Sequence, residues 1–152
     1  MGNGVFPTEL FDETSEKIRK NGKEFGATTG RPRRCGWLDL VALKYAIDIN
    51  GITDLVVTKL DILKGFDKIK LGVGYECDGV KHESFPASAS LAEKIKPLYR
   101  EFDCWDSDVS QVERYEDLPK ECREYLEFIE EYTETKISLV SVGPEREKTF
   151  EK

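Results

Sequence analysis

The stretch from Trp37 to Asn50 is apolar around almost the whole circumference of a helix, which strongly limits the possible folds. Its apolar residues recur at helical spacing and are Leu38, Leu40, Val41, Ala42, Leu43, Tyr45, Ala46, Ile47 and Ile49. After Asp39 at the start of the stretch, only Lys44 and Asp48 interrupt them. A helix that is apolar nearly all round is typically buried. We therefore predict a buried helix here, and we expect its cover to come from elsewhere. Asp39 lies at its N-terminal end, and Gly51 ends it.

Short apolar runs and a turn signal predict strands around this helix. Leu55–Val57 has the continuous apolar character of a central parallel strand buried on both faces. Further strands are predicted over 69–75, 80–85, 97–102 and 137–140, the first two joined as a hairpin across Cys77-Asp78-Gly79. Amphipathic helices are predicted over about 7–20 and 118–132, the second with Pro119 near its first position. This order favours an α/β fold with an inserted hairpin.

Composition excludes several classes of protein. The 152 residues fit one domain and carry a net charge of −7, which argues against a general nucleic-acid or membrane surface. No apolar run is long enough to span a membrane, and Met1-Gly2-Asn3-Gly4 lacks the pattern of a signal peptide. The four cysteines are widely spaced, which favours free thiols in a reducing compartment. We expect a cytoplasmic protein whose one histidine, His82, is structural or merely exposed.

The segment Gly26–Arg34 concentrates groups that bind anions. Two glycines bracket Thr28 and Thr29, and three arginines follow within four positions. Backbone N–H groups in such a loop can form an anion-binding concavity, and guanidinium groups match the oxygens of carboxylates and phosphates in pairs. The segment is either a site for several negative oxygens or a flexible basic turn on the surface.

Thr58-Lys59-Leu60-Asp61 follows the predicted strand 55–57 and suits a guanine base. One carboxylate at Asp61 can accept both the N1–H and the exocyclic amine of guanine, while the aliphatic stem of Lys59 lies on the base. Adenine lacks this pair of donors. A strand-terminal turn with a surface ion pair would explain the same residues.

Ser141-Val142-Gly143 follows the last predicted strand in the same way. Two neighbouring strand-end loops could close around one base, with serine and backbone N–H groups at its polar edge and Gly143 permitting close approach. Without such a neighbour the tripeptide is an ordinary turn. We expect the arginine segment and both strand-end loops to converge on one pocket.

Five segments of this chain resemble adenylosuccinate synthetases in content and in order. They are Gly4–Glu9, Glu24–Gly30, Arg33–Asp39, Thr58–Asp61 and Ser141–Pro144. The resemblance covers nearly the whole chain and matches roughly the last third of such an enzyme. It implies a C-terminal region, 1–152, of a P-loop-NTPase-like, mostly parallel α/β sheet with flanking helices and an inserted β-hairpin.

The resemblance also implies a function. The family forms adenylosuccinate from IMP, L-aspartate and GTP with Mg²⁺, and the GTP γ-phosphate first moves to the 6-oxygen of IMP. Ala27, Thr28, Thr29, Gly30, Arg31, Pro32 and Arg33 resemble the loop that holds the aspartate carboxylates. Arg31 is similar to an arginine that contacts IMP. Arg33, Lys59, Leu60, Asp61, Ser141, Val142 and Gly143 are similar to residues that bind GTP.

Two departures from the family limit this expectation. Pro32 stands where members commonly carry a basic residue, and proline removes one backbone donor. The chain also has no glycine-rich phosphate loop and no N-terminal aspartate and histidine of the kind that the family uses as base and acid. We therefore expect no catalytic residue and no metal ligand here, and no activity without the missing N-terminal part, which would hold Mg²⁺. The complete enzyme would be a homodimer.

An alternative function remains open. The chain can instead be a stand-alone, non-catalytic module that binds nucleotides or anions. An ordinary GTPase domain is disfavoured because the phosphate loop is missing.

Overall fold

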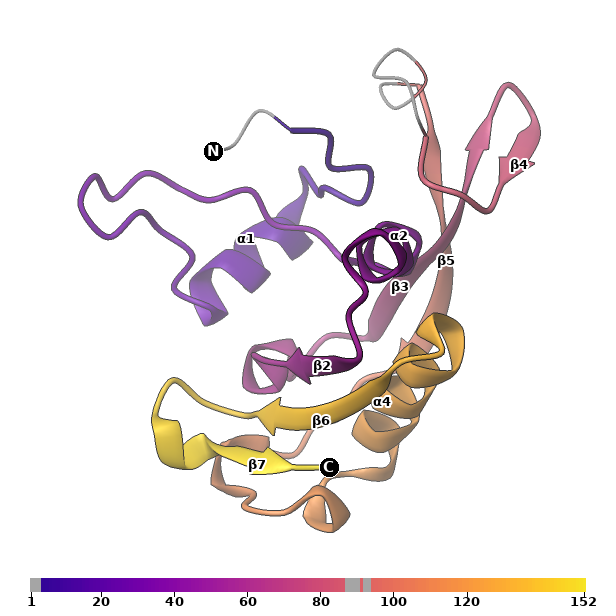
Figure 1. The fold of residues 1–152 in the computed structure, drawn as a ribbon. Helices are drawn as coiled ribbons and strands as arrows, with labels where there is room; N and C mark the ends of the chain where they lie inside the picture. Colours follow the sequence, from indigo (N-terminus) through magenta and orange to yellow (C-terminus); the bar gives the residue numbers. More distant parts are fainter. Residues whose placement is uncertain (1–3, 87–90, 92–93) are drawn as a thin grey trace. The chain divides into compact units, whose positions relative to one another are not determined.

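The computed structural model describes residues 4–86, 91 and 94–152, and it has a mixed α/β fold with two sheets (Figure 1). The first three residues, on which the argument about a signal peptide rests, lie outside this range. The helices and strands are α1 (Glu13–Asn21), β1 (Leu38–Asp39), α2 (Leu40–Asn50), β2 (Asp54–Val57), β3 (Lys68–Cys77), β4 (Val80–His82), β5 (Lys96–Asp103), α4 (Lys120–Thr133), β6 (Lys136–Ser141) and β7 (Thr149–Glu151). Four 3₁₀ turns join them, η1 (Leu60–Leu63), η2 (Val109–Gln111), η3 (Tyr115–Asp117) and η4 (Arg146–Lys148).

The chain divides into two compact units, each built from two separate stretches. Unit 1 comprises Met1–Tyr45 and Lys70–Glu101, and unit 2 comprises Ala46–Ile69 and Phe102–Lys152. None of the described helices combines the length and the apolar character that a membrane crossing requires. The four cysteines are free thiols, as predicted.

The predicted hairpin is confirmed in the first sheet, where β3 and β4 are antiparallel with Cys77 opposite Val80. Asp78 and Gly79 form the turn, and both have positive φ angles, 50° and 78°. This is the backbone that a two-residue hairpin turn requires, and glycine adopts it without a steric penalty. On its other side β3 pairs in parallel with β1, and β5 also pairs with β3.

The first helix begins later than predicted, at Glu13 instead of near Pro7. Asp12 caps it, because its side chain accepts hydrogen bonds from the N–H groups of Thr14 and Ser15. The preceding residues are used elsewhere. The Thr8 hydroxyl donates to the Trp37 carbonyl at 2.7 Å, and Glu9 forms an antiparallel bridge with Gly36. Tertiary pairing therefore overrides the local helical signal.

The apolar helix exists, but it begins at Leu40 because Leu38 and Asp39 pair with β3 as strand β1. Its burial is also incomplete. Leu40, Val41 and Ile47 are buried, whereas 62% of Ile49 is exposed. Within the described residues the helix is therefore buried on one face only, and nothing among them covers the outer face of the last turn, where we expect cover from elsewhere.

In the second sheet β2 and β6 are parallel, and β6 and β7 are antiparallel. The order β2-β6-β7 places β6 in the centre and β2 at an edge. The prediction that 55–57 is a central strand buried on both faces is wrong here, because Val56 is 54% exposed. Within the described residues both sheets mix parallel and antiparallel pairs, so the expected mostly parallel sheet is not seen.

The core of unit 2 forms where α4 packs on β6. The inward positions of both elements are fully buried and comprise Cys122, Leu126, Ile129, Ile137 and Val140. Trp105 lies edge-on to Tyr125, with 5.9 Å between ring centroids. These contacts confirm the predicted helix over 118–132 and the predicted buried strand over 137–140. They fix the end of β6, where the second candidate loop begins.

Candidate functional site

In unit 1 the segment Gly26–Arg34 is a narrow loop closed by its own backbone. The Gly26 N–H donates to the Arg31 carbonyl at 2.8 Å, and the Gly30 N–H donates to the Gly26 carbonyl at 2.8 Å. Gly30 has a φ of +64°, which this tight return requires. Residues 27–34 are all exposed. The loop is therefore ordered at its base and open to solvent at its tip.

Pro32 fits this loop without breaking its backbone pairing. It stands opposite Phe25 in an antiparallel bridge. The hydrogen bonds of this bridge come from its neighbours, Gly26 N–H to Arg31 carbonyl and Arg33 N–H to Glu24 carbonyl. Residue 32 needs no N–H here, so proline costs no bond of this pairing.

The three arginines of the loop have different partners. Arg34 donates from Nε to Glu9 at 2.8 Å and from Nη1 to the Gly4 carbonyl, and its guanidinium lies over the Phe6 ring. Arg33 forms an ion pair with Glu24, with 3.0 Å between Nη1 and Oε2. Arg31 has no ion pair within the part of the chain that the structure describes. Arg34 therefore stabilises the unit, while Arg31 remains available to an anion.

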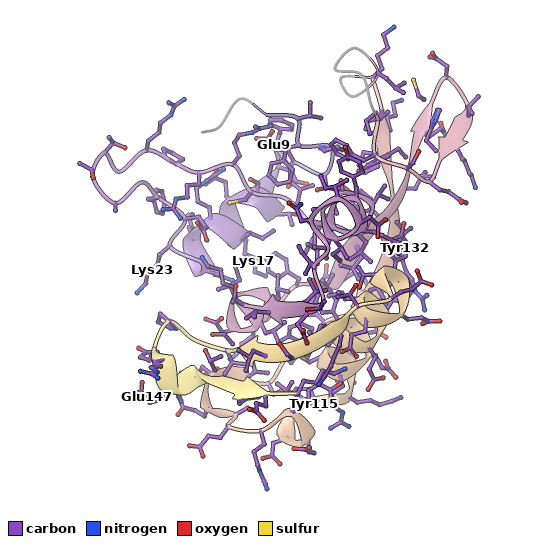
Figure 2. The ribbon with its side chains drawn as sticks, viewed as in Figure 1. Glu9, Lys17, Lys23, Tyr115, Tyr132 and Glu147 are labelled. Carbon is purple, nitrogen blue, oxygen red and sulfur yellow. The ribbon has the colours of Figure 1, made fainter. Side chains whose placement is uncertain are left out.

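A hollow of about 510 Å³ lies beside this loop in unit 1. It is lined by both acids and arginines, among them Glu9, Asp12, Glu16, Arg19 and Arg33. Glu9, labelled in Figure 2, is held by Arg34, and Glu16 is held by Arg19. The lining charges are thus largely neutralised by one another. The hollow is a less suitable anion site than the exposed loop tip.

In unit 2 the two predicted strand-end loops lie side by side. Strands β2 and β6 are parallel, with Val57 opposite Val140. The segments Lys59–Asp61 and Ser141–Gly143 therefore leave the same edge of the sheet, where open α/β sheets bind ligands. The pairing predicted from sequence is confirmed for these two loops. The segment Gly26–Arg34, from here on the arginine loop, belongs to unit 1. That it lines a common pocket with these two loops stays a prediction.

The first of these loops has a constrained backbone and a partly buried carboxyl. Lys59 is in the left-handed conformation, with φ 66° and ψ 34°, and Leu60 is fully buried. Burial raises the pKa of the Asp61 carboxyl, the charge of Asp108 acts in the same direction, and Lys59 acts against both. The carboxyl group is therefore partly shielded from bulk water. A hydrogen bond from a ligand is stronger in such surroundings than in water.

The second loop is held by its own contacts. Ser141 is buried, and its hydroxyl donates to the Gly143 carbonyl at 3.0 Å. The Val142 N–H donates to the Lys148 carbonyl at 2.9 Å. A Cβ at Gly143 would lie 2.9 Å from Lys148 Cγ, so a larger residue here would have to displace the Lys148 side chain. In this structure the Ser141 hydroxyl shapes the turn, and its proton is used within the loop.

A third segment at this edge was missed by the sequence reasoning. Turn η2 packs against η1, and the Lys148 Nζ donates to Gln111 Oε1 at 3.4 Å. Asp108 caps η2 by accepting from the Ser110 N–H at 3.0 Å, and this bond lowers the pKa of Asp108. The pattern Asp108-Val109-Ser110 is a local capping signal. Nothing in it indicates proximity to Asp61, which only the tertiary fold provides.

Across residues 4–86, 91 and 94–152, no three His, Cys, Asp or Glu side chains gather as a metal site. His82 lies on β4 opposite Tyr75 and is half-buried.

Known proteins match the chain along almost its entire length. A family model described as adenylosuccinate synthetase matches residues 1–150. The chain is 56% identical over 150 residues to the adenylosuccinate synthetase of Clostridium novyi (strain NT), and 52% identical to that of Fusobacterium nucleatum subsp. nucleatum. Each match covers 99% of this chain and 35% of the relative.

A solved structure also matches. It is described as fully ligated adenylosuccinate synthetase from Plasmodium falciparum, with 36% identity and a TM-score of 0.93. The match covers 100% of this chain and 37% of that one. The chain thus spans roughly a third of the length of these relatives.

Proposed function

The chain belongs to the adenylosuccinate synthetase family, and on this premise we propose that it is the substrate- and GTP-binding portion of such an enzyme. The complete enzyme would be a ligase that joins IMP and L-aspartate in AMP biosynthesis. GTP would phosphorylate the 6-oxygen of IMP, and the aspartate amine would then displace that phosphate, giving adenylosuccinate, GDP and phosphate. Residues 1–152 would act as one region of that enzyme.

The parallel pairing of β2 and β6 carries this proposal, because it brings Lys59–Asp61 beside Ser141–Gly143. The Asp61 carboxylate would accept the N1–H and the amine of guanine. The Lys59 stem would cover one face of the base, and the backbone of Leu60, Val142 and Gly143 would approach its edge. Hydrogen bonds to a charged group contribute about 1.5–3 kcal/mol each. A purine without both donors would therefore bind much more weakly.

The exposed loop tip in unit 1 would bind the acidic substrates. The backbone of Ala27–Gly30 and the Thr28 and Thr29 hydroxyls would hold the aspartate carboxylates. Arg31 would contact IMP, and Arg33 would contact GTP. The availability of Arg31 and the exposure of Arg33, whose side chain is 57% accessible, support these roles.

The remaining parts of the proposal concern the longer protein. We place this chain at the carboxyl end of that protein, with the phosphate loop, the catalytic acid and base, and the Mg²⁺ ligands in a part that precedes it. Mg²⁺ would there neutralise charge on the transferring phosphate. A cytoplasmic homodimer completes the proposal. Sequencing the full reading frame tests the placement, and a frame that continues far beyond Lys152 instead of before Met1 would contradict it.

The substitution Asp61→Asn in the longer enzyme tests the guanine assignment. An amide cannot accept both guanine donors with one charged group, so GTP use should collapse. XTP, which presents a carbonyl in place of the amine, should partly restore activity. Asp67→Asn, at an exposed aspartate of the same unit, is the control and should leave GTP use unchanged. Undiminished GTP use by Asp61→Asn would remove the assignment.

The alternative is a stand-alone module that binds nucleotides or anions without catalysis. The two functions separate when the preceding part is added in cis or in trans and GTP-dependent adenylosuccinate formation is assayed. A folded, reconstituted protein that binds GTP and makes no product would favour the module.

A further inference from the structure

Glu24 and Arg33 are joined at two levels at the base of the arginine loop. The Arg33 N–H donates to the Glu24 carbonyl at 3.0 Å, and the Arg33 guanidinium donates from Nη1 to the Glu24 carboxylate at 3.0 Å. The side chain of Glu24 is only 17% exposed, whereas that of Arg33 is 57% exposed. The carboxylate is thus the fixed partner of this ion pair, and the guanidinium is the accessible one.

The backbone of Arg33 is fixed as well. Its carbonyl accepts a hydrogen bond from Arg19 Nε at 3.0 Å, and Pro32 immediately before it is paired with Phe25. An arginine side chain has several rotatable bonds, whose freedom is lost when it binds a ligand. Here the main chain of Arg33 is already held in place, and part of this loss of freedom has occurred before a ligand arrives.

The ion pair leaves most of the guanidinium available. Arginine has five N–H donors in a planar fork, and Glu24 takes one of them from Nη1. Among the described residues no further side-chain partner of Arg33 occupies the remaining donors. A carboxylate at one edge of the guanidinium, with open donors along the rest of it, orients the group without blocking it.

We infer that Glu24 is a positioning residue, which holds the Arg33 guanidinium ready for a phosphate of the nucleotide. This inference rests on the function proposed above, and it adds a residue that the sequence reasoning did not select. Glu24 itself touches no ligand and acts through Arg33. Its loss would therefore weaken nucleotide binding by releasing the guanidinium into many rotamers.

The experiment compares Glu24→Gln, Arg33→Ala and the double variant in the longer enzyme. Glu24→Gln should raise the KM for GTP about tenfold, the effect of one charge-assisted contact, and leave kcat within about twofold. In the Arg33→Ala background, Glu24→Gln should add nothing, because its target is gone. Glu101→Gln is the matched control, since it breaks the Lys70–Glu101 ion pair of the same unit (2.8 Å) and should change neither constant.

Each outcome decides a separate point. Additive effects of the two substitutions, or a lower KM in Glu24→Gln, would overturn the inference, since the pair would then be structural or would compete with the ligand. An unchanged KM in Arg33→Ala would instead contradict the proposed contact of Arg33 with GTP. Glu24→Asp provides a second variant if Glu24→Gln fails to fold. It keeps the charge but shortens the side chain, so a KM between those of wild type and Glu24→Gln is expected, and a KM at or above that of Glu24→Gln would count against the inference.

Discussion

The Tyr75 hydroxyl donates a hydrogen bond to the Asp39 carboxylate at 2.8 Å, and both residues are buried in unit 1. The other carboxylate oxygen accepts the Ala42 N–H at 3.0 Å. One side chain therefore ties β1 to β3 and caps the start of α2. Because Asp39 follows the segment that carries the arginines, this contact also anchors the carboxyl side of the arginine loop.

Removing the Tyr75 hydroxyl should destabilise the protein with little change in the shape of the side chain. We expect Tyr75→Phe to lower the free energy of unfolding by about 1–3 kcal/mol, because one buried oxygen of the Asp39 carboxylate then loses its donor. Urea unfolding followed by circular dichroism measures the loss. Tyr45→Phe is the control, since Tyr45 is 49% exposed, and its effect should be much smaller. Equal effects of the two substitutions would show that the buried contact has no special role.

The close approach of Gly36 to Thr8 predicts a second stability effect. A Cβ at position 36 would lie 2.2 Å from the Thr8 carbonyl oxygen, which is backbone and cannot rotate away. Gly36→Ala should therefore cost roughly 1–3 kcal/mol or more through overpacking. Gly4→Ala places a Cβ in open space and should be neutral. A Gly36→Ala protein with an unchanged melting temperature would contradict the contact.

Alkaline pH should destabilise unit 2 through Cys122. Burial raises the pKa of the Cys122 thiol to about 12, whereas an exposed thiol has a pKa of about 8.5. The folded state holds the proton more tightly, so this stabilisation is complete below the unfolded value and is lost as pH rises toward the folded value. Urea unfolding between about pH 8 and pH 11 should show the fall. Cys122→Ala should be less stable at every pH but have a flatter pH profile, and an unchanged slope would count against this assignment.

Mildly acidic pH should weaken guanine binding if Asp61 has the proposed role. Since burial and then Asp108 raise the pKa of Asp61, its carboxylate is protonated at a higher pH than an exposed aspartate. As the pH is lowered, binding of GTP should therefore weaken at a higher pH than it would with an exposed aspartate in the same role. Asp108→Asn should move this fall to lower pH, whereas Asp106→Asn, at an exposed neighbour, should not. Calorimetric titration with GTP across this range measures both.

Local patterns predicted much of the fold because their causes are local. Asp78-Gly79 forms the hairpin turn since its positive φ angles are a property of those two residues. The spacing of Cys122, Tyr125 and Ile129 was sufficient to predict α4, because one face of that helix is buried whatever covers it. The start of α1 was mispredicted for the opposite reason. Thr8 and Glu9 pair with Trp37 and Gly36, far along the chain.

The sequence by itself determined the types of functional group, their order along the chain and the family. The reason is that the chemistry of a side chain and the conformation of a turn depend on residues that are close together in the sequence. Only the tertiary structure decided which groups meet. It brought Lys59–Asp61 beside Ser141–Gly143 through the parallel pairing of β2 with β6, and it placed Asp108 near enough for its charge to raise the pKa of Asp61. It also paired Arg33 with Glu24 and Arg34 with Glu9, and it left Arg31 without an ion pair among the described residues. These relationships depend on contacts between residues distant in sequence, which no local pattern encodes.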